Sequence, residues 1–319
     1  MKRTVLIGVM LAVLAHGAGA KTPPAPRPYR PTHNSYGQPD FNGVWSFNSM
    51  TRLERPAGVP SLVLSEDEAG RRIPPSILPN DSVGTADTEA YDGFNLGWAR
   101  MGDEIRSSWL IEPANGRLPY RPEAEANLRV PSNNDNPEGR STYERCLILP
   151  QDGPPMLNAA YNNNMQILQT RDHVAIQLEG NHEVRIVRLT SRVHAPGATS
   201  QWMGDSVGWY EGETLVVETV GFTPSQSDRR SAMTRVYMSP AAKVTERFTR
   251  ISASQIRYAF SVDDPTVFAQ VWKGEIPLTV TTEPTFEYAC HEGNYGLENI
   301  LSGARYEEEH PRAPRPAAR

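Results

Sequence analysis

The sequence predicts a mainly β protein: an antiparallel up-and-down barrel or strongly curved sheet, lipocalin-like in the broad sense, with long loops and one or two short helices. Three observations support this fold class. After residue 164, about nine short segments rich in Val, Ile, Thr and aromatic residues follow one another, several are joined by tight turns, and the clearest ones alternate apolar with polar residues. Strands joined by tight turns are antiparallel neighbours, and a sheet of this size exposes edges unless it curls or closes.

The predicted strands are bounded by turn-forming residues and cover 165–170, 173–179, 184–189, 206–210, 214–220, 244–251, 255–262, 267–272 and 286–290. Hairpin-length turns are expected at 171–172, 180–181, 211–213 and 252–254. The strand from Val244 is unusual because Glu246 falls on its apolar face, between Val244 and Phe248. This position indicates either a residue at the barrel mouth or one partner of a buried ion pair.

The folded region is expected to begin at Asp40, with a first strand around Trp45, whose ring would close one end of a barrel. A short helix is predicted after Ser65, because Ser65 and Glu68 have the spacing of a capping box. Turn formers dominate residues 74–136, which should form long loops over the sheet, interrupted by a short strand within residues 107–111.

The two ends of the chain differ in composition from the folded region. Residues 1–20 have the three parts of a cleavable secretory signal peptide: a basic start, an apolar run and a small-residue cleavage site. Residues 21–39 form a proline-rich leader, and residues 306–319 a charged, proline-rich tail that we expect to be disordered, which leaves 40–305 as a single β domain. The apolar run is too short to span a bilayer and no later segment is suitable, so we expect a periplasmic or secreted protein without an integral membrane segment.

The charge of the chain argues against nucleic acid as a partner. The net charge is −5 and the Lys and Arg residues are dispersed, so no basic stripe is available to bind phosphates. The expected partner is a small-molecule ligand or substrate, and no feature indicates an oligomeric state.

The chain has two cysteines, Cys146 and Cys290, both beyond the signal peptide. In an oxidising compartment two cysteines indicate one disulfide, which here would close a long loop and stabilise the fold. The alternative is a nucleophilic Cys290 next to His291. It is less favoured because Cys290 is expected to end the last strand, where neighbouring side chains point to opposite faces.

Histidine, carboxylate and arginine side chains gather near the predicted strand ends. The candidates for catalysis are His182, His194, Arg185, Asp205, His291 and Glu292. No metal site is expected, because the first two histidines lack a close-spaced partner and neither HExxH nor paired CxxC occurs. The GxSxG match at 204–208 lacks the helix that must follow a nucleophile elbow, and no phosphate-binding glycine motif follows a strand. Acid–base chemistry without a cofactor remains.

The candidate ligand-binding residues are Tyr161, Asn163, Trp202, Trp209, Tyr258 and Trp272. The aromatic ones favour a hydrophobic or aromatic small molecule, and we expect all the candidates to converge on one pocket at the barrel mouth. The sequence therefore predicts an exported acid–base enzyme, a lyase, isomerase or hydrolase, acting on such a molecule. The alternative is a periplasmic binding protein that holds a hydrophobic small molecule without converting it, with each histidine a hydrogen-bonded structural residue.

Five segments read YNNNMQILQT, WMGDS, WYEGETLVVET, ERF and YACHEGNY; they begin at Tyr161, Trp202, Trp209, Glu246 and Tyr288. Through these segments most of the mature chain resembles a large family of exported bacterial proteins of uncharacterised function. The resemblance implies homology but no particular reaction. The chain departs from the family pattern at residues 188–194, where relatives tend to have Pro-Leu-Asp-Gly-Arg-Pro-His. Arg192 and His194 match that pattern, whereas the added Arg188 and the missing Asp leave room for a different ligand.

Overall fold

The structure is a computed structural model. It describes residues 29–72, 97–129, 135–159, 161–196, 200–224, 229–230 and 235–311. The predicted signal peptide, residues 21–28 of the leader and residues 312–319 of the tail lie outside these ranges. None of the described helices is long and apolar enough to cross a membrane.

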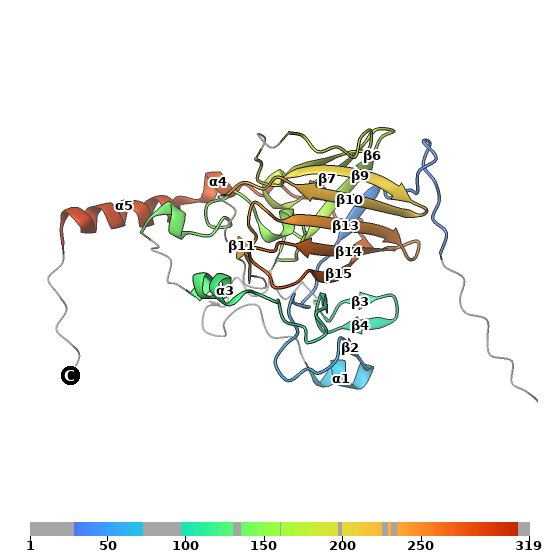
Figure 1. The fold of residues 1–319 in the computed structure, drawn as a ribbon, viewed down its shortest axis with the longest axis horizontal. Helices are drawn as coiled ribbons and strands as arrows, with labels where there is room; N and C mark the ends of the chain where they lie inside the picture. Colours follow the sequence, from blue (N-terminus) through green and yellow to red (C-terminus); the bar gives the residue numbers. More distant parts are fainter. Residues whose placement is uncertain are drawn as a thin grey trace, which may run out of the picture.

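The body of the molecule is a closed β-barrel (Figure 1). In order around the wall, its strands are β1 (Gly43–Ser46), β6 (Asn164–Gln169), β7 (His173–Leu178), β8 (Val184–Arg188), β9 (Asp205–Glu211), β10 (Thr214–Val220), β13 (Lys243–Arg250), β14 (Gln255–Asp263) and β15 (Trp272–Val280). The barrel closes where β1 pairs with β15 in the register Trp45↔Val280. Strand β5 (Leu110–Glu112) pairs with β15 outside the ring. The predicted mainly β barrel is confirmed.

One pair of neighbouring strands departs from the up-and-down pattern. Strands β8 and β9 are parallel and pair only at Val187↔Ser206 and Arg188↔Val207, whereas the other neighbours are antiparallel. The chain therefore crosses from one end of the barrel to the other between β8 and β9.

The two ends of the barrel differ in their connections. Tight turns join β6 to β7, β9 to β10 and β13 to β14 at one end, which we call the turn end. Strands β1, β10 and β14 end at the opposite end of the barrel, which we call the loop end. The short 3₁₀ turn η3 (Gly180–His182) between β7 and β8 also lies at the loop end.

The first seven predicted strands are confirmed to within two residues at each end as β6 to β10, β13 and β14. The prediction of a strand over 267–272 is wrong: Val267 and Phe268 both donate backbone hydrogen bonds to Asp264 O in a turn, and β15 starts only at Trp272. The prediction over 286–290 is also wrong. There the backbone N–H groups donate to side chains instead of a neighbouring strand, and Cys290 begins a helix.

The side chains that point into the barrel fill it. The inner face of β14 is almost completely buried through Ile256, Tyr258, Phe260 and Val262. The rings of Phe260 and Trp272 pack edge to face with centroids 5.7 Å apart. Gly274 permits this packing, because a Cβ atom there would overlap the Phe260 ring. Trp45 is 1 % exposed, and its Nε1 donates to Phe41 O at 2.9 Å. The interior is therefore a packed core.

A small sheet of β2 (Val63–Leu64), β4 (Glu104–Arg106) and β3 (Arg100–Met101) lies beside the barrel, below β15 in Figure 1. Helix α1 (Glu66–Arg71) follows β2 and begins with the predicted capping box: Ser65 Oγ accepts from Glu68 N, and the Glu68 carboxylate accepts from Ser65 N. Of the short strand expected over 107–111, only residues 110–111 are in a strand, as part of β5.

The other short elements are α3 (Pro122–Arg129), η1 (Pro137–Gly139), η2 (Pro150–Asp152), β11 (Arg229–Arg230), β12 (Arg235–Val236) and α4 (Cys290–Gly293). Helix α5 (Tyr295–Glu309) is longer and projects from the loop end of the barrel (Figure 1). It continues through Glu309 into the segment predicted to be disordered, because the run of Glu, Leu and Ala residues has high helix propensity. At the other end, the leader packs on the barrel through Gln38 Nε2, which donates to Thr170 O and Arg171 O.

Candidate functional site

The structure divides the predicted site residues among three places. The first place is the barrel interior, which holds Arg185, Tyr258 and Trp272. The second is the outer face of the barrel with the connection to β9, which holds His194, Trp202, Asp205 and Trp209. The third is the loop end, which holds the disulfide and Tyr161, Asn163, His182, His291 and Glu292. The prediction of one common pocket is therefore wrong. The reason is strand alternation: Arg185 and Arg188 are an odd number of residues apart on β8, so the first points into the barrel and the second points outward.

Inside the barrel, Arg185 and Glu246 form the buried ion pair that the position of Glu246 indicates. Both terminal nitrogens of Arg185 donate to the Glu246 carboxylate, and the two side chains are 2 % and 0 % exposed. Tyr258 Oη donates to Glu246 Oε1 at 2.7 Å and accepts from Met156 N at 2.9 Å. Burial and the Glu246 charge raise the pKa of Tyr258, so its phenol stays neutral. This network stabilises the core and gives Arg185 no opening toward a ligand.

On the outer face, His194 lies between two carboxylates. Its Nδ1 is 2.9 Å from Asp205 Oδ2, and its Nε2 is 3.2 Å from Glu218 Oε1. Arg188 donates twice to Asp205, and Ala195 N donates to the same carboxylate at 2.9 Å. These donors, Arg188 first, hold the pKa of Asp205 well below its usual value. The cluster fixes the connection after β8 to the barrel wall.

The neighbouring aromatic residues of this face make their own contacts. The Arg192 guanidinium lies over the Trp209 ring, 4.3 Å from its centroid. Trp209 Nε1 donates to Glu211 Oε1 at 2.9 Å. Trp202 is half-buried in the turn before β9. Ser206, the residue of the GxSxG match, is buried on β9 and shares a 2.8 Å hydrogen bond with Thr219 Oγ1, so it has no access to a substrate.

At the loop end, side-chain acceptors of the barrel bind the backbone of a distant segment. Glu179 Oε1 accepts from Phe286 N at 3.0 Å, and Glu179 Oε2 accepts from Asn164 N at 3.2 Å. His182 Nε2 accepts from Tyr288 N at 3.0 Å. A ring nitrogen that accepts carries no proton, so neutral His182 has its proton on Nδ1 and can donate it to a ligand.

The backbone that presents His182 is strained. Asn181 and His182 have φ angles of 49° and 56°, in the left-handed region that non-glycine residues rarely adopt. The preceding Gly180 packs against η2 so closely that a Cβ atom would lie 2.6 Å from Asp152 Oδ1. Strained residues held by tight packing cluster at functional sites, which marks η3 as a candidate.

A recess of about 290 Å³ opens where the 285–287 segment lies beside the end of β7. Its lining consists of Gln177, Leu178, Glu179, His182, Thr285, Phe286 and Glu287. Phe286 is 64 % exposed. The lining contains two carboxylates and no Lys or Arg, which gives the recess a negative charge.

Three tyrosines lie next to this segment. Tyr143 and Tyr161 share a 2.5 Å hydrogen bond between their phenols, and the rings of Tyr161 and Tyr288 have centroids 6.2 Å apart. Burial, followed by hydrogen bonds to the other two phenols, raises the pKa of Tyr143. Burial also raises the pKa of Tyr161. These phenols therefore stay protonated and can donate hydrogen bonds at neutral pH.

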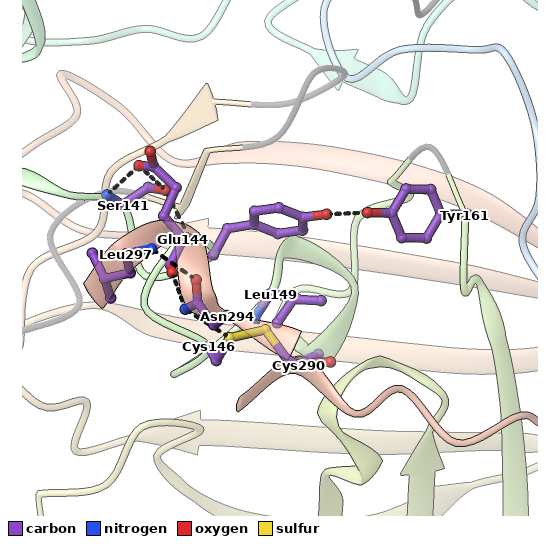
Figure 2. Close-up of a disulfide and its surroundings, with 10 residues drawn as sticks. Ser141, Glu144, Cys146, Leu149, Tyr161, Cys290, Asn294 and Leu297 are labelled. Atoms are coloured by element: carbon purple, nitrogen blue, oxygen red, sulfur yellow. Dashed lines mark hydrogen bonds between the residues drawn. A yellow bond between two sulfur atoms is a disulfide. The ribbon is translucent and has the colours of Figure 1, made fainter. Parts of the chain in front are cut away.

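The disulfide between Cys146 and Cys290 is confirmed, with Cα atoms 5.7 Å apart (Figure 2). Cys290 lies in α4 and not in a strand, and the adjacent His291 and Glu292 are exposed. Asn163 has a local structural contact: its Oδ1 accepts from Ala159 N at 2.7 Å.

Tyr143, Glu179, Phe286 and Tyr288 are not among the predicted site residues. Tyr288 begins the YACHEGNY segment, and Tyr143 stands three residues before a cysteine of the disulfide, so proximity to the two cysteines was the available signal. Glu179 stands near His182 and Arg185 in a polar stretch of the sequence, whereas Phe286 carries no sequence signal, because its contact with Glu179 joins segments more than a hundred residues apart.

Comparison of the chain with models of known protein families, with curated proteins and with solved structures finds no match. Within the described ranges, no group of three His, Cys, Asp or Glu side chains is arranged to hold a metal. The site is therefore interpreted from its own chemistry.

Proposed function

We propose that the mature protein is exported and binds a small organic molecule in the loop-end recess. The observation that carries this proposal is the recess itself, which is lined by the mostly exposed Phe286 together with Glu179 and His182 at the edge of a packed barrel. Small-molecule sites combine apolar surface with a few well-placed polar groups. The signal-peptide pattern and the disulfide support a compartment outside the reducing cytoplasm.

The lining favours one class of ligand. Phe286 is mostly exposed and offers apolar contact, whereas Glu179 and Glu287 supply negative charge without a balancing cation in the lining. A positively charged amine attached to an aromatic or other apolar body satisfies both features, and an ammonium group can also lie against the face of the Phe286 ring. An anionic ligand of the same shape would be repelled.

Binding is better supported than catalysis at this recess. Both carboxylate oxygens of Glu179 and the Nε2 atom of His182 already accept backbone hydrogen bonds. A general base must reach the proton that it removes with a free lone pair: the Nε2 lone pair of His182 is occupied, and Glu179, although each of its oxygens keeps a second lone pair, is only 5 % exposed. These groups are therefore arranged to hold the recess together and to orient a ligand.

The acid–base enzyme predicted from the sequence remains the second candidate, and the His194 site favours it. The contact between Nδ1 of His194 and Asp205 orients the ring as a general base requires. Glu218, 3.2 Å from Nε2, has to move aside before a substrate can approach that nitrogen.

Calorimetric titration of the mature protein with three compounds of one size tests the binding proposal: phenylethylamine, phenylacetate and benzyl alcohol. The amine should bind most tightly, and Phe286→Ala should weaken its binding by about tenfold, roughly the loss of one cation–π contact and its buried area. Val63→Ala is the control, because Val63 is exposed on the small sheet, outside the recess. Binding of none of the compounds, or equal binding to the Phe286→Ala variant, would contradict the proposal.

A further inference from the structure

The last part of the described chain differs from the barrel in burial. From Thr281 to Pro311, a segment that we call the C-terminal arm, no residue is buried, whereas the barrel strands bury alternate side chains. The arm forms no strand pair. Segments with few buried contacts open at low free energy while the rest of a protein stays folded.

Three backbone hydrogen bonds seat the first part of the arm on the barrel. Thr281 N donates to Val44 O at 3.1 Å, and the N–H groups of Phe286 and Tyr288 donate to Glu179 and His182 at 3.0 Å each. The last two donors are two residues apart in an extended chain, so they point in the same direction. The arm is thus bound along one edge by single hydrogen bonds, which water can replace.

The disulfide is the strongest attachment of the arm. Cys146 is almost completely buried in the body of the protein, whereas Cys290 is half-buried and the neighbouring Ala289 and His291 are exposed. Asn294 Nδ2 donates to Glu144 O at 2.8 Å beside it (Figure 2). With the disulfide intact, the segment between Val280 and Cys290 is anchored at both ends, so its open state has little freedom. Without the disulfide, the hydrogen bonds that Asn294 donates to Glu144 O and that Arg305 donates to Asp135 O remain, and water can replace both.

The arm is also one wall of the recess. Thr285, Phe286 and Glu287 line it from the arm, and Glu179 and His182 line it from the barrel side. Release of the arm would therefore remove the aromatic surface and one carboxylate from the site. It would leave the other carboxylate and the imidazole facing solvent.

We infer that the Cys146–Cys290 disulfide is a latch that controls ligand binding: the oxidised form holds the arm in place and assembles the recess, and reduction releases the arm and dismantles it. This inference rests on the proposed function, because it assigns a regulator to the same site. A dithiol reductant supplies the two electrons and two protons, the S–S bond breaks, both cysteines become thiols and the reductant becomes a disulfide.

Ligand binding and the redox state of the latch are then linked in both directions. If oxidation strengthens binding by some factor, a bound ligand must favour the oxidised state by the same factor, because the coupling free energy is reciprocal. The ligand itself should therefore slow the reduction of the disulfide.

Hydrogen–deuterium exchange of the full mature chain tests the latch without any ligand. On reduction with dithiothreitol, and in the Cys146→Ser/Cys290→Ser variant, peptides covering residues 281–290 should exchange at least tenfold faster, while peptides from β13 and β14 keep their protection. Unchanged exchange in the arm would overturn the inference. So would an equal loss of protection in β13 and β14, since the disulfide would then hold the whole fold and not the arm.

Binding of phenylethylamine to the oxidised protein and to the double-serine variant tests the linkage. We expect at least tenfold weaker binding to the variant, and slower reduction of the wild-type disulfide at saturating amine. Equal affinity for both forms would overturn the latch and leave the proposed function standing. If the amine binds neither form, the proposed function fails, and the exchange experiment alone decides whether the disulfide latches the arm.

Discussion

The barrel and the C-terminal arm use similar polar contacts with opposite consequences. In the barrel, Arg185 and Glu246 are both buried and surrounded by packed aromatic rings. In the arm, the backbone N–H groups of Phe286 and Tyr288 are bound by Glu179 and His182, but no residue of the arm is itself buried. The comparison indicates that the barrel supplies rigidity and that the candidate site lies where a weakly held segment meets it. Function commonly lies on such segments, positioned by a rigid scaffold.

The sharpest contrast is expected between a buried and an exposed glutamate of similar chemistry. Glu246→Ala leaves the Arg185 charge unpaired in the core and should lower the free energy of unfolding by about 3–5 kcal/mol. Glu211→Ala is the matched control: Glu211 binds Arg247 at 2.7 Å, both side chains are exposed, and the loss should be much smaller because solvent screens an exposed ion pair. Urea denaturation measures both losses. Similar losses would show that the buried pair contributes no more to stability than an exposed pair.

The disulfide is expected to have the next largest effect. Its cysteines are 144 residues apart, for which the chain-entropy estimate is about 5 kcal/mol, although native disulfides commonly contribute about 2–4 kcal/mol. The Cys146→Ser/Cys290→Ser variant should lose stability in this range and still unfold in one cooperative transition. A variant that shows no cooperative transition would contradict a barrel that folds independently of the latch.

Overfilling the barrel interior should cost less than unpairing its charge. Gly274→Ala puts a methyl group into the Phe260 ring and should lower the free energy of unfolding by about 1–3 kcal/mol. Gly303→Ala in α5 is the matched control, because the added Cβ meets no atom there. Higher helix propensity should make that variant neutral or slightly more stable. Equal destabilisation of both variants would contradict the contrast between core and arm.

The outer-face cluster predicts an acid-dependent effect of about 1 kcal/mol. Because the pKa of Asp205 is lowered in the folded state, its contribution is present above the ordinary value of 3.8 and is lost as the pH falls below it. Denaturation of the wild type and of Asp205→Asn measures this contribution at two pH values. One is neutral and the other is about one unit below the ordinary pKa of an aspartate, at about pH 3. A stability difference that grows on acidification would have the wrong sign.

The smallest expected effect on stability belongs to the arm. Phe286→Ala should change the free energy of unfolding by no more than about 0.5 kcal/mol, because the side chain is mostly exposed. The same variant should bind the amine about tenfold more weakly, so thermal denaturation and calorimetry together separate stability from binding. A large loss of stability would show that Phe286 packs into the fold.

The elements that could be predicted from sequence are those whose signal is local. Strand alternation indicated the inner face of β14, the spacing of Ser65 and Glu68 indicated the capping box of α1, and the acid on an apolar face indicated the buried pair of Glu246. Each of these three signals depends on residues within a few positions of one another, so it can be recognised without knowledge of the tertiary structure.

The separation of the candidate residues could not be predicted, because it depends on which face of which strand each residue occupies. Arg185 and Arg188 lie on one strand but point to opposite sides of the barrel wall, and one residue of register decides between the two. The conformation of the arm could not be predicted either. Residues 286–290 have the composition of a strand, but the strands of the closed barrel are already paired on both sides.

The most direct test of the account is the folding of the barrel without the arm. A mature chain that ends after Thr282 and carries Cys146→Ser should show near-ultraviolet circular dichroism from its packed tryptophans and one cooperative thermal transition. It should also have lost all binding of phenylethylamine. A chain that is unfolded, or one that still binds the amine with wild-type affinity, would contradict the separation of a rigid barrel from a latched arm that completes the site.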